Sequence, residues 1–355
     1  MHTVADPEPS SSRSRAEGAV APATTRVAIA GATGYTGQEL LRILSRHPAV
    51  SVTAAMSSGT TAARKLPALA RLWGGEITPL SPDTLREADV VFLALPDAAA
   101  AELGPALVDA GVRVIDLSGA FRLRQETERA RWYPETRRVP ADTAYGLTEL
   151  ERSAVAAARL VANPGCYPTA KLLALAPLVA AGLLVPDTDV IVDAKSGVSG
   201  AGKTPSERTH FSECHGSLAA YGVFGHRHGA EIAQGVAAAS SQTHVVNFVP
   251  HLVPLDRGIL STIYVRLRSG TTEQSLAEVF ERTYASAPFV RLVGSTLPEI
   301  KHVAHTNFCD VGWRVDASGR AVLVSVIDNL LKGASGQAVQ NLNVMLGIDE
   351  RTGLW

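Results

Sequence analysis

The chain has 355 residues, of which 46% are hydrophobic and 19% are charged. This length predicts about two domains, and this much apolar material excludes disorder over most of the chain. The formal net charge of −1 excludes binding to nucleic acid or to an anionic membrane through bulk charge, although a local basic pocket stays compatible with it.

The first 25 residues are rich in Ser, Ala and Pro and lack the apolar core of a secretory signal, so we expect a disordered extension there. From Arg26, short apolar runs alternate with helical stretches, one of which covers 97–110. Four buried strands are predicted, over 26–30, 50–55, 90–95 and 112–117. This alternation predicts a Rossmann-type parallel sheet with right-handed crossovers.

After about Asn163 the pattern becomes mixed α/β. It predicts a helix over 168–181, a strand over 189–194, a half-exposed strand over 260–268 and a final helix over 334–346. Ile263, Val265 and Leu267 on the half-exposed strand are compatible with a sheet-to-sheet contact between subunits. The final helix is expected to return to the first domain. The predicted domains are therefore 26–165 with 330–355, and 166–329.

A glycine-rich turn, Gly31 to Gly37, joins the first strand to its helix. Glycines allow a pyrophosphate to approach the backbone, and the helix N-terminus attracts it, although a turn of this kind can also bind nothing. The second strand runs into Ser57 and Ser58 rather than an acid, and Arg64 and Lys65 follow. Hydroxyls and cations favour NADP(H) over NAD(H), unless the two cations are ordinary surface charges.

The sequence Asn163-Pro164-Gly165-Cys166 predicts a sharp turn at the start of a helix, because Pro168 suits a first helical turn. A thiol there is expected to have a lowered pKa and to act as a nucleophile, whereas most free cysteines are simply buried. Cys214 and Cys309 lack such a setting. Three cysteines without a CxxC unit favour a reducing, cytoplasmic location.

A nucleophilic thiolate beside a nicotinamide indicates hydride transfer at a thioester or thiohemiacetal carbon. His226 and His228 are both candidate acid/base groups that Glu231 could orient, and the residues alone do not choose between them. Together with Cys214 and His215 they match no common zinc spacing, so no metal is predicted. The longest apolar stretch, 172–185, is too short to span a membrane.

Nine ordered blocks carry a resemblance to a known family. They are GATGYTG from Gly31, FLALPD from Phe92, DLSGAFRL from Asp116, YGLTE from Tyr145, NPGCYPT from Asn163, SGVSGAGK from Ser196, HRHGAEI from His226, FVPHLVPLDRGILST from Phe248 and DNLLKGASGQAVQNLN from Asp328. From Arg26 onwards the chain resembles the N-acetyl-gamma-glutamyl-phosphate reductases, within the aspartate-semialdehyde dehydrogenase group. Gly119 and the pair Gly229-Ala230 depart from the usual family pattern.

The resemblance implies an α/β fold, with a Rossmann-type NADP-binding domain and a mixed α/β domain for catalysis and oligomerisation. It implies an NADPH-dependent enzyme of arginine biosynthesis that reduces an acyl phosphate to a semialdehyde and releases phosphate, as a homodimer or homotetramer. Cys166 would be the nucleophile and His226 its acid/base partner, with Glu231 nearby. Residues expected to contact the cofactor are Gly31, Thr33, Gly34, Tyr35, Thr36, Gly37, Ser57, Ser58, Leu95, Pro96, Ser196, Gly197 and Asn329. Residues expected to contact the substrate are Ser118, Arg122, Asn163 and Lys203, although Lys203 is also compatible with a contact to phosphate.

Two alternatives remain at this point. A related reductase of lysine synthesis acts on a carrier-linked acyl phosphate, but its acidic carrier needs a basic entrance that the near-neutral charge does not support. A protein that only binds NADP would need neither Cys166 nor His226.

Overall fold

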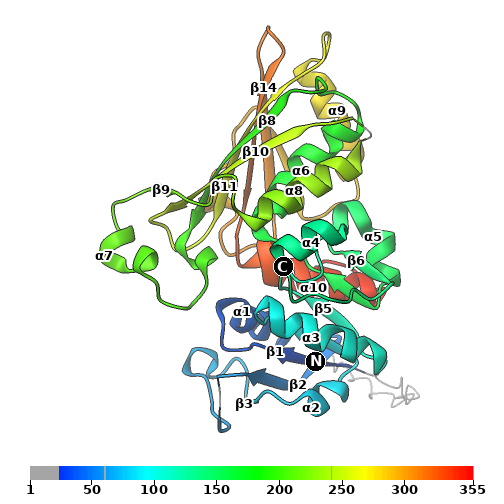
Figure 1. Cartoon of the computed structure of the whole chain (residues 1–355), viewed down its shortest axis with the longest axis vertical. Helices are drawn as coiled ribbons and strands as arrows, with labels where there is room; N and C mark the ends of the chain where they lie inside the picture. Colours follow the sequence, from blue (N-terminus) through cyan, green and yellow to red (C-terminus); the bar gives the residue numbers. More distant parts are fainter. Residues whose placement is uncertain (1–23, 60, 241, 355) are drawn as a thin grey trace, which may run out of the picture.

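The computed structural model describes residues 24–59, 61–240 and 242–354, which form two lobes, one below the other in Figure 1. The predicted N-terminal extension lies outside the described residues, except for its end. There the first strand begins at Thr25, one residue before the predicted start.

The lower lobe contains a seven-stranded sheet in the order β3-β2-β1-β4-β5-β7-β6, and every strand pair in it is parallel. The strands are β1 (Thr25–Ala30), β2 (Val50–Ser57), β3 (Ile77–Pro79), β4 (Val90–Leu93), β5 (Arg113–Asp116), β6 (Thr143–Tyr145) and β7 (Leu160–Ala162). The four predicted strands are confirmed with small changes at their ends. The sequence prediction missed the other three, each of three residues, because they are too short to show a periodic pattern.

Helices cover both faces of this sheet, as a parallel sheet requires. They are α1 (Tyr35–Leu44), α2 (Pro82–Arg86), α3 (Asp97–Asp109), α5 (Thr148–Ala157) and α10 (Gly336–Met345). The short α4 (Glu126–Trp132) has no buried residue and lies outside the core. Val27 and Ile29 of β1 share one core with Val339 and Leu342 of α10. The return of the final helix to the first sheet is therefore confirmed.

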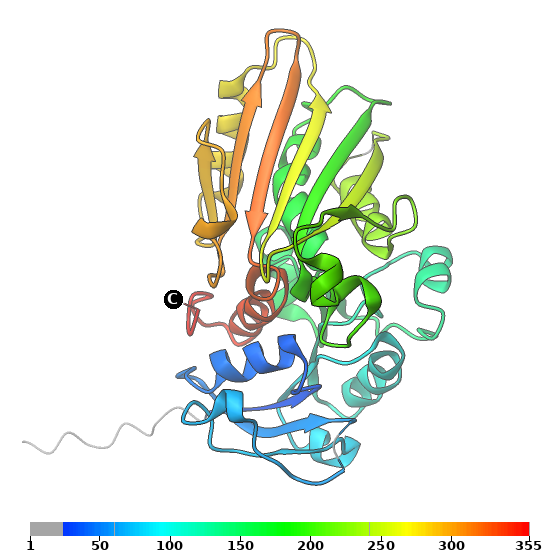
Figure 2. The ribbon, with the colours of Figure 1, turned by 90° about the vertical axis from the view of Figure 1, so that its left-hand side faces the viewer.

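The upper lobe contains a mixed seven-stranded sheet in the order β12-β13-β14-β11-β8-β10-β9. Its strands are β8 (Asp189–Gly197), β9 (Ala219–Ala220), β10 (Val245–Val253), β11 (Ile259–Arg266), β12 (Val290–Gly294), β13 (Cys309–Val315) and β14 (Arg320–Ile327). Helices α6 (Cys166–Ala180), α8 (Arg227–Ala239) and α9 (Glu273–Tyr284) pack against one face of this sheet. Figure 2 shows the strands in front of these helices.

The other face of the upper sheet is open only in part, because Val324 and Val326 of β14 are buried there against Val303. Ile191, Val245 and Tyr264 on it are 44%, 52% and 43% exposed. Ile263 and Val265 point the opposite way, into the core beneath the helices. The predicted alternation of this strand is confirmed, but the prediction assigned the wrong side chains to a contact between subunits, because the inward-facing residues are the ones already covered.

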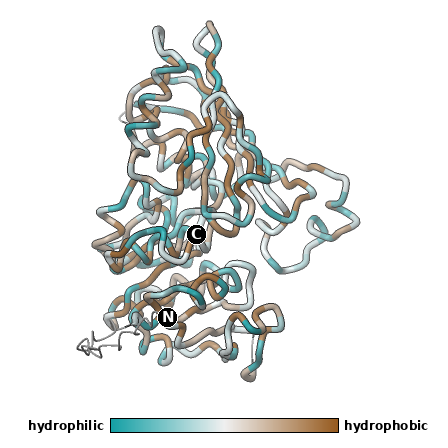
Figure 3. The backbone as a smooth tube through the Cα atoms, turned by 180° about the vertical axis from the view of Figure 1, so that it is seen from behind, coloured by the Kyte–Doolittle hydropathy of each residue, from teal (hydrophilic) through white to brown (hydrophobic). Residues whose placement is uncertain are grey.

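Between β8 and α8 the chain leaves the upper lobe as a protruding arm, which carries α7 (Phe211–Cys214) and is seen at the left of Figure 1 and at the right of Figure 3. Short 3-10 turns cover Pro67–Leu69, Val198–Ala201, Glu207–Thr209 and Ile300–His302, and a π-helical turn covers Leu331–Ser335. Within the described ranges, no helix combines the length and hydropathy needed to cross a bilayer.

Candidate active site

Cys166 is the first residue of α6, and Gly165 is the N-cap. The turn before it continues from β7, whose neighbour in the sheet is β5, and the N–H of Asn163 donates to the carbonyl of Asp116 at the end of β5. The thiol therefore stands where parallel strands end and a helix begins, a usual place for a site in an α/β sheet. The predicted position of Cys166 at a helix start is confirmed.

A buried ion pair supports the turn that carries Cys166. Glu231 of α8 accepts hydrogen bonds from the N–H of Gly165 at 2.9 Å and from the Tyr145 hydroxyl at 2.7 Å. Its other oxygen lies 3.4 Å from the Arg122 guanidinium. These bonds hold Glu231 against the Gly165 turn instead of against His226, so its predicted role in orienting the histidine is corrected.

Arg122 and Asn163 form hydrogen bonds within the protein that the sequence did not predict. Arg122 is buried, and it donates to the carbonyls of Asn163 at 2.8 Å and Leu117 at 2.9 Å in addition to facing Glu231. The Asn163 amide is fixed by the Ala334 carbonyl and the Asn341 side chain. Both residues therefore position the turn, and their contacts with substrate stay a prediction.

Ser118 lies in the same loop as Arg122 and is turned inward. Its hydroxyl donates to Asp116 at 2.7 Å and accepts from the N–H of Ala120. Burial raises the pKa of Asp116 to about 6, although the bonds from Ser118 oppose the rise. Ser118 thus shapes the loop through Asp116.

The two histidines at the start of α8 differ in environment. His226 is the half-buried N-cap, and its Nδ1 accepts the N–H of His228 at 3.0 Å. His228 is buried, and its Nε2 faces Arg122 at 3.4 Å. Burial, with Arg227 and Lys171, lowers the pKa of His226 to about 4. His226 is therefore a neutral ring whose remaining nitrogen, Nε2, carries the proton as a donor.

Aromatic rings surround His226 close to Cys166 in the fold. Tyr167, which directly follows Cys166, packs edge-on against His226 and Phe248, with ring centroids 5.8 and 5.1 Å away. The Tyr221 hydroxyl donates to the Tyr167 hydroxyl at 3.2 Å. Arg227, next to His226, forms an ion pair with Asp97 of α3 at 2.5 Å, which joins the two lobes beside the site.

The half-buried Cys166 thiol does not have the lowered pKa that its helix position predicted. Burial raises the pKa of Cys166 above its ordinary value, while Lys171, Arg122 and the N–H of Tyr167 act in the opposite direction. The helix terminus alone predicts a lowered pKa, whereas the burial of Cys166 and the effect of Lys171 arise only in the folded chain. The signal for Lys171 was a single charge within an otherwise apolar helix.

The glycine-rich turn has the shape that a pyrophosphate needs. Gly31 has φ of +93°, and a Cβ atom there would lie 2.0 Å from the carbonyl oxygen of Ala94. Gly34 is the N-cap of α1, and the first turn of this helix has no side-chain cap and no acidic residue. The N–H groups of that turn are thus left for an anion.

The remaining residues predicted to contact the cofactor surround this turn. Thr33 and Ser57 share a hydrogen bond of 2.9 Å, and Ser58 is exposed beside them. Tyr35, Thr36 and Gly37 form the first turn of α1, while Leu95 and Pro96 lie between β4 and α3. Lys203 donates to the Thr33 carbonyl at 3.3 Å, which places it at the dinucleotide turn, and its contact with substrate stays a prediction.

Ser196, Gly197 and Asn329 meet at the lobe boundary. Asn329 accepts from the N–H of Gly258 at 2.7 Å and donates to Ser199 at 3.0 Å. A Cβ atom at Gly200 would lie 2.8 Å from the Ser196 hydroxyl and 3.7 Å from the Asn329 amide. The structure therefore brings together the predicted nicotinamide-side residues.

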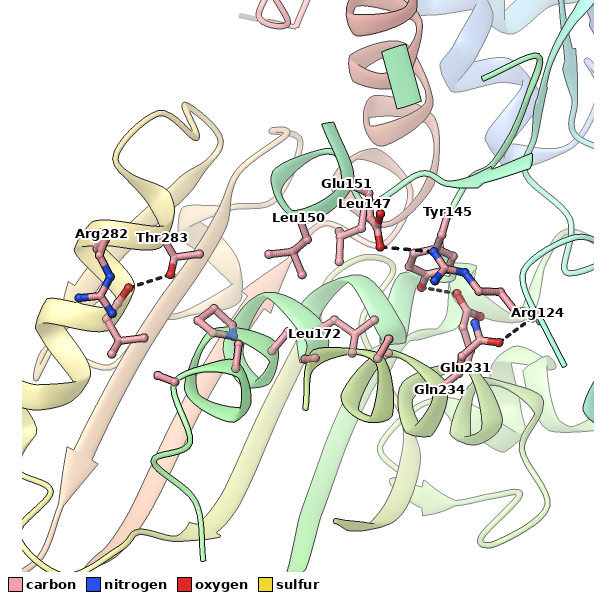
Figure 4. A pocket seen from close by; sticks show the side chains of 18 residues that line it. Arg124, Tyr145, Leu147, Leu150, Glu151, Leu172, Glu231, Gln234, Arg282 and Thr283 are labelled. Carbon is pink, nitrogen blue, oxygen red and sulfur yellow. Dashed lines mark hydrogen bonds and ion pairs between the residues drawn. The ribbon is translucent and has the colours of Figure 1, made fainter. Parts of the chain in front are cut away.

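A separate cavity of about 450 Å³ lies between helices α5, α6, α8 and α9. Figure 4 shows Tyr145 and Glu231 at one end of it and Arg282 at the other. Glu231 also accepts from the Gly165 N–H and from the Tyr145 hydroxyl, so the cavity lies behind the turn that carries Cys166.

Among the described residues, no group of three His, Cys, Asp or Glu side chains is placed to hold a metal ion.

Comparisons with known proteins agree with this geometry. Residues 26–158 match the family model described as semialdehyde dehydrogenase, NAD binding domain, and residues 166–329 match the one described as semialdehyde dehydrogenase, dimerisation domain. An N-acetyl-gamma-glutamyl-phosphate reductase from Symbiobacterium thermophilum is 47% identical over 343 residues, covering 93% of this chain and 97% of that protein. The chain belongs to the N-acetyl-gamma-glutamyl-phosphate reductase family. A second member of this family, from Brevibacillus brevis, is 46% identical and covers 93% of this chain and 97% of its own.

Solved structures show the same fold at lower identity. Aspartate semialdehyde dehydrogenase II from Vibrio cholerae is 19% identical with a TM-score of 0.71, and the match covers 91% of this chain and 99% of that one. An aspartate semialdehyde dehydrogenase with NADP from Candida albicans is 16% identical with a TM-score of 0.65, and covers 91% and 99%.

The structure accounts for one departure from the usual N-acetyl-gamma-glutamyl-phosphate reductase pattern. A Cβ atom at Gly119 would lie 2.2 Å from the Tyr133 ring, so a side chain at this position would require the ring to move. At Gly229 the nearest atom would be 3.9 Å away in Phe248. Helix α8 nevertheless begins at Arg227 with His226 in place.

Proposed function

We propose that this chain is an NADPH-dependent N-acetyl-gamma-glutamyl-phosphate reductase in which Cys166 is the nucleophile. The observation that carries the proposal is the position of Cys166 at the start of α6, on a turn fixed by Glu231 and Arg122, in a member of this family. The half-buried His226 is linked to it through Tyr167.

The cofactor would be held at the boundary of the lobes. The Gly31–Gly37 turn suits its pyrophosphate, because Gly31 packs closely against Ala94 and the first turn of α1 has no side-chain cap and no acidic residue. Lys203 adds a positive charge there, and Ser57 and Ser58 at the end of β2, a strand without an acidic residue, suit a ribose phosphate. Leu95, Pro96, Ser196, Gly197 and Asn329 are proposed on the nicotinamide side. Bound NADPH would supply a hydride to an acyl carbon attached to Cys166.

In this mechanism the Cys166 thiolate attacks the acyl carbon of N-acetyl-gamma-glutamyl phosphate. A carbon–sulfur bond forms, the bond to the phosphate oxygen breaks, and inorganic phosphate leaves. His226 donates from Nε2 to the oxygen on which negative charge develops, since its Nδ1 is occupied by the N–H of His228. After reduction, the carbon–sulfur bond breaks, N-acetylglutamate 5-semialdehyde is released and the thiolate returns.

The reverse reaction tests this proposal. The free N-acetylated semialdehyde, NADP⁺ and inorganic phosphate are expected to generate NADPH, which is followed by absorbance. Cys166→Ala should retain NADPH binding and lose turnover, whereas Cys214→Ser, a matched change on the protruding arm, should retain both. Appreciable turnover by Cys166→Ala would reject the nucleophile. Folded wild-type protein without turnover would reject the free substrate in favour of a carrier-linked one.

We further propose a homodimer, or a homotetramer built from it, that forms through the open face of the upper sheet. This face exposes Ile191, Val245 and Tyr264, and the matching family model is described as a dimerisation domain. The proposed division of the chain is 26–165 with 330–355 for the cofactor, and 166–329 for catalysis and dimerisation. Free Cys166, Cys214 and Cys309 support a reducing, cytoplasmic location.

A further inference from the structure

Lys171 is a buried lysine on α6, five residues after the proposed nucleophile. Its side chain is fully buried, and its ammonium nitrogen has no hydrogen-bond partner among the described residues. This nitrogen lies 4.1 Å from the centroid of the Tyr167 ring and 5.4 Å from that of Phe248. Those two rings also pack against His226, so Lys171 and His226 share one aromatic cluster.

The environment of Lys171 is costly for the fold. A buried polar group without a partner loses its hydration without replacement, and a buried charge loses more. Lys332, which is also fully buried, shows the usual solution, because it donates to Glu149 at 2.6 Å and to Gln340 at 2.7 Å. Lys171 has only ring faces, which stabilise an ammonium more than a neutral amine. Its position is therefore not explained by stability.

Among the described residues, the titratable or charged groups that interact with Lys171 or with its neighbour Cys166 belong to the site or to the core beside it. These groups are Cys166 and Tyr167 on α6, His226 at the N-cap of α8, His228 and Glu231 on α8, Tyr221, Arg122 and Cys309. Glu231 is already paired with Arg122. Burial raises the pKa of Cys309 to about 12, so that thiol stays protonated. The thiolate of Cys166 is the anion left to face the Lys171 charge.

The two groups shift each other's ionisation. Burial raises the pKa of the Cys166 thiol, and Lys171 is the first of the groups that oppose this rise. Burial lowers the pKa of Lys171 well below its ordinary value, and Cys166 opposes that fall. The Cys166 thiolate and the Lys171 ammonium are each unfavourable alone, and each is more favourable when the other is charged, as in a coupled pair.

We propose that Lys171 is a positioning residue that stabilises the Cys166 thiolate from its buried place among the Tyr167, Phe248 and His226 rings. When the sulfur–hydrogen bond breaks, the proton is carried as a new nitrogen–hydrogen bond on Lys171. The thiol–amine and thiolate–ammonium forms therefore contain the same protons and the same net charge. This inference rests on the proposed function, in that Cys166 is taken as the nucleophile.

The arrangement of His226 explains why the Cys166 thiolate needs a cation other than this histidine. Its Nδ1 is engaged by the backbone of His228, and its pKa of about 4 keeps the ring neutral at physiological pH. A neutral ring donates a hydrogen bond but does not offset a full negative charge. Lys171 supplies that charge without contacting the substrate, while His226 stays free to serve the substrate oxygen.

Lys171→Met tests the inference, because methionine fills the space with a flexible apolar chain. In a Cys214→Ser background, the alkylation rate of Cys166 by iodoacetamide is measured against pH by mass spectrometry of its peptide. The reaction reports the thiolate fraction. We expect the titration curve to move up by about one pH unit, with about tenfold slower alkylation at neutral pH. The midpoint of urea unfolding should be unchanged or higher, since an unpaired buried polar group has been removed.

Two lysine variants are the controls. Lys301→Met removes an exposed lysine paired with Glu299 and should leave the alkylation curve in place. Lys332→Met leaves Glu149 buried without its cation and should lower the unfolding midpoint without moving the curve. If Lys171→Met behaves like either control in the alkylation assay, the inference is overturned. Alkylation of Cys166 does not depend on turnover. A wild-type protein without activity would therefore reject the proposed function, and the alkylation result would still test the role of Lys171.

A second measurement covers the case in which Lys171→Met does not fold. The ¹⁵N signal of the Lys171 side-chain nitrogen is followed against pH in wild type and in Cys166→Ala. We expect the ammonium form to persist to higher pH in wild type, because only there is the thiolate present. Identical titration of Lys171 in both proteins would overturn the inference.

Discussion

Replacing Glu231 with Gln should separate the charge of the buried ion pair from its hydrogen bonds. The amide oxygen of Gln can still accept from the Gly165 N–H and the Tyr145 hydroxyl, which lie 2.9 and 2.7 Å from Glu231. The negative charge facing Arg122 is lost. Arg122 then keeps a positive charge in a place where its side chain is only 7% exposed.

The size of the effect follows from the geometry. Two unit charges 3.4 Å apart, as in this pair, attract by about 5 kcal/mol at an effective dielectric constant of about 20. Removing one partner of a buried pair typically costs about 3–5 kcal/mol, because the other charge is left without compensation. Glu231 is 1% exposed, so solvent screening does not reduce this value. We expect Glu231→Gln to lower the free energy of unfolding by about 3–5 kcal/mol.

A double-mutant cycle measures this by urea unfolding of wild type, Glu231→Gln, Arg122→Met and the double variant. Fluorescence and circular dichroism must give the same transition for the free energies to be compared. The double variant should lose clearly less than the sum of the single variants, because no unpaired charge remains. Additive losses, or a loss below about 1 kcal/mol in Glu231→Gln, would show that the pair carries no such energy.

Two further predictions concern the dinucleotide turn and a buried carboxyl. Gly31→Val should abolish NADPH binding in a fluorescence titration, because the new Cβ would lie 2.0 Å from the Ala94 oxygen at a φ of +93°. Gly74→Ala is its control, because a Cβ atom there would meet nothing within 4 Å. Retained NADPH binding by Gly31→Val would contradict the proposed role of the turn. Burial raises the pKa of Asp116 to about 6 in the folded chain, above the value of about 4 in an unfolded chain. The folded state therefore binds this proton more tightly, and stability should fall by about 3 kcal/mol as pH rises from about 4 to about 6. Asp116→Asn should remove that fall in melting temperatures measured against pH, and an unchanged fall would assign it to other groups.

Local patterns were sufficient to predict the elements that position the site. The apolar run of β1, the glycines after it and the periodic face of α1 are all encoded within about twenty neighbouring residues. The start of α6 was equally local, because Gly165 and Pro168 limit where a helix can begin. Such features depend on backbone geometry, which a short stretch of sequence determines.

The contacts that fix the chemistry were not predictable in the same way. Arg122 and Glu231 are 109 residues apart, and only the folded chain shows that they face each other under Gly165. Lys171 interrupts an apolar helix, but its neighbours on β10 and α8 decide whether such a charge is paired or isolated. The burial of Cys166 similarly depends on distant segments, so the direction of its pKa shift could not be derived from its helix position.

The position of α10 has a consequence for biosynthesis. Val339 and Leu342 complete the same core as Val27 and Ile29, although the whole upper lobe lies between them in the sequence. A ribosome makes about 5–20 residues each second. The core of the lower lobe is therefore incomplete during the time in which the whole upper lobe is synthesised. A nascent lower lobe exposes the apolar groove that α10 will fill, and chaperones that hold apolar surfaces are expected to bind it until synthesis reaches that helix.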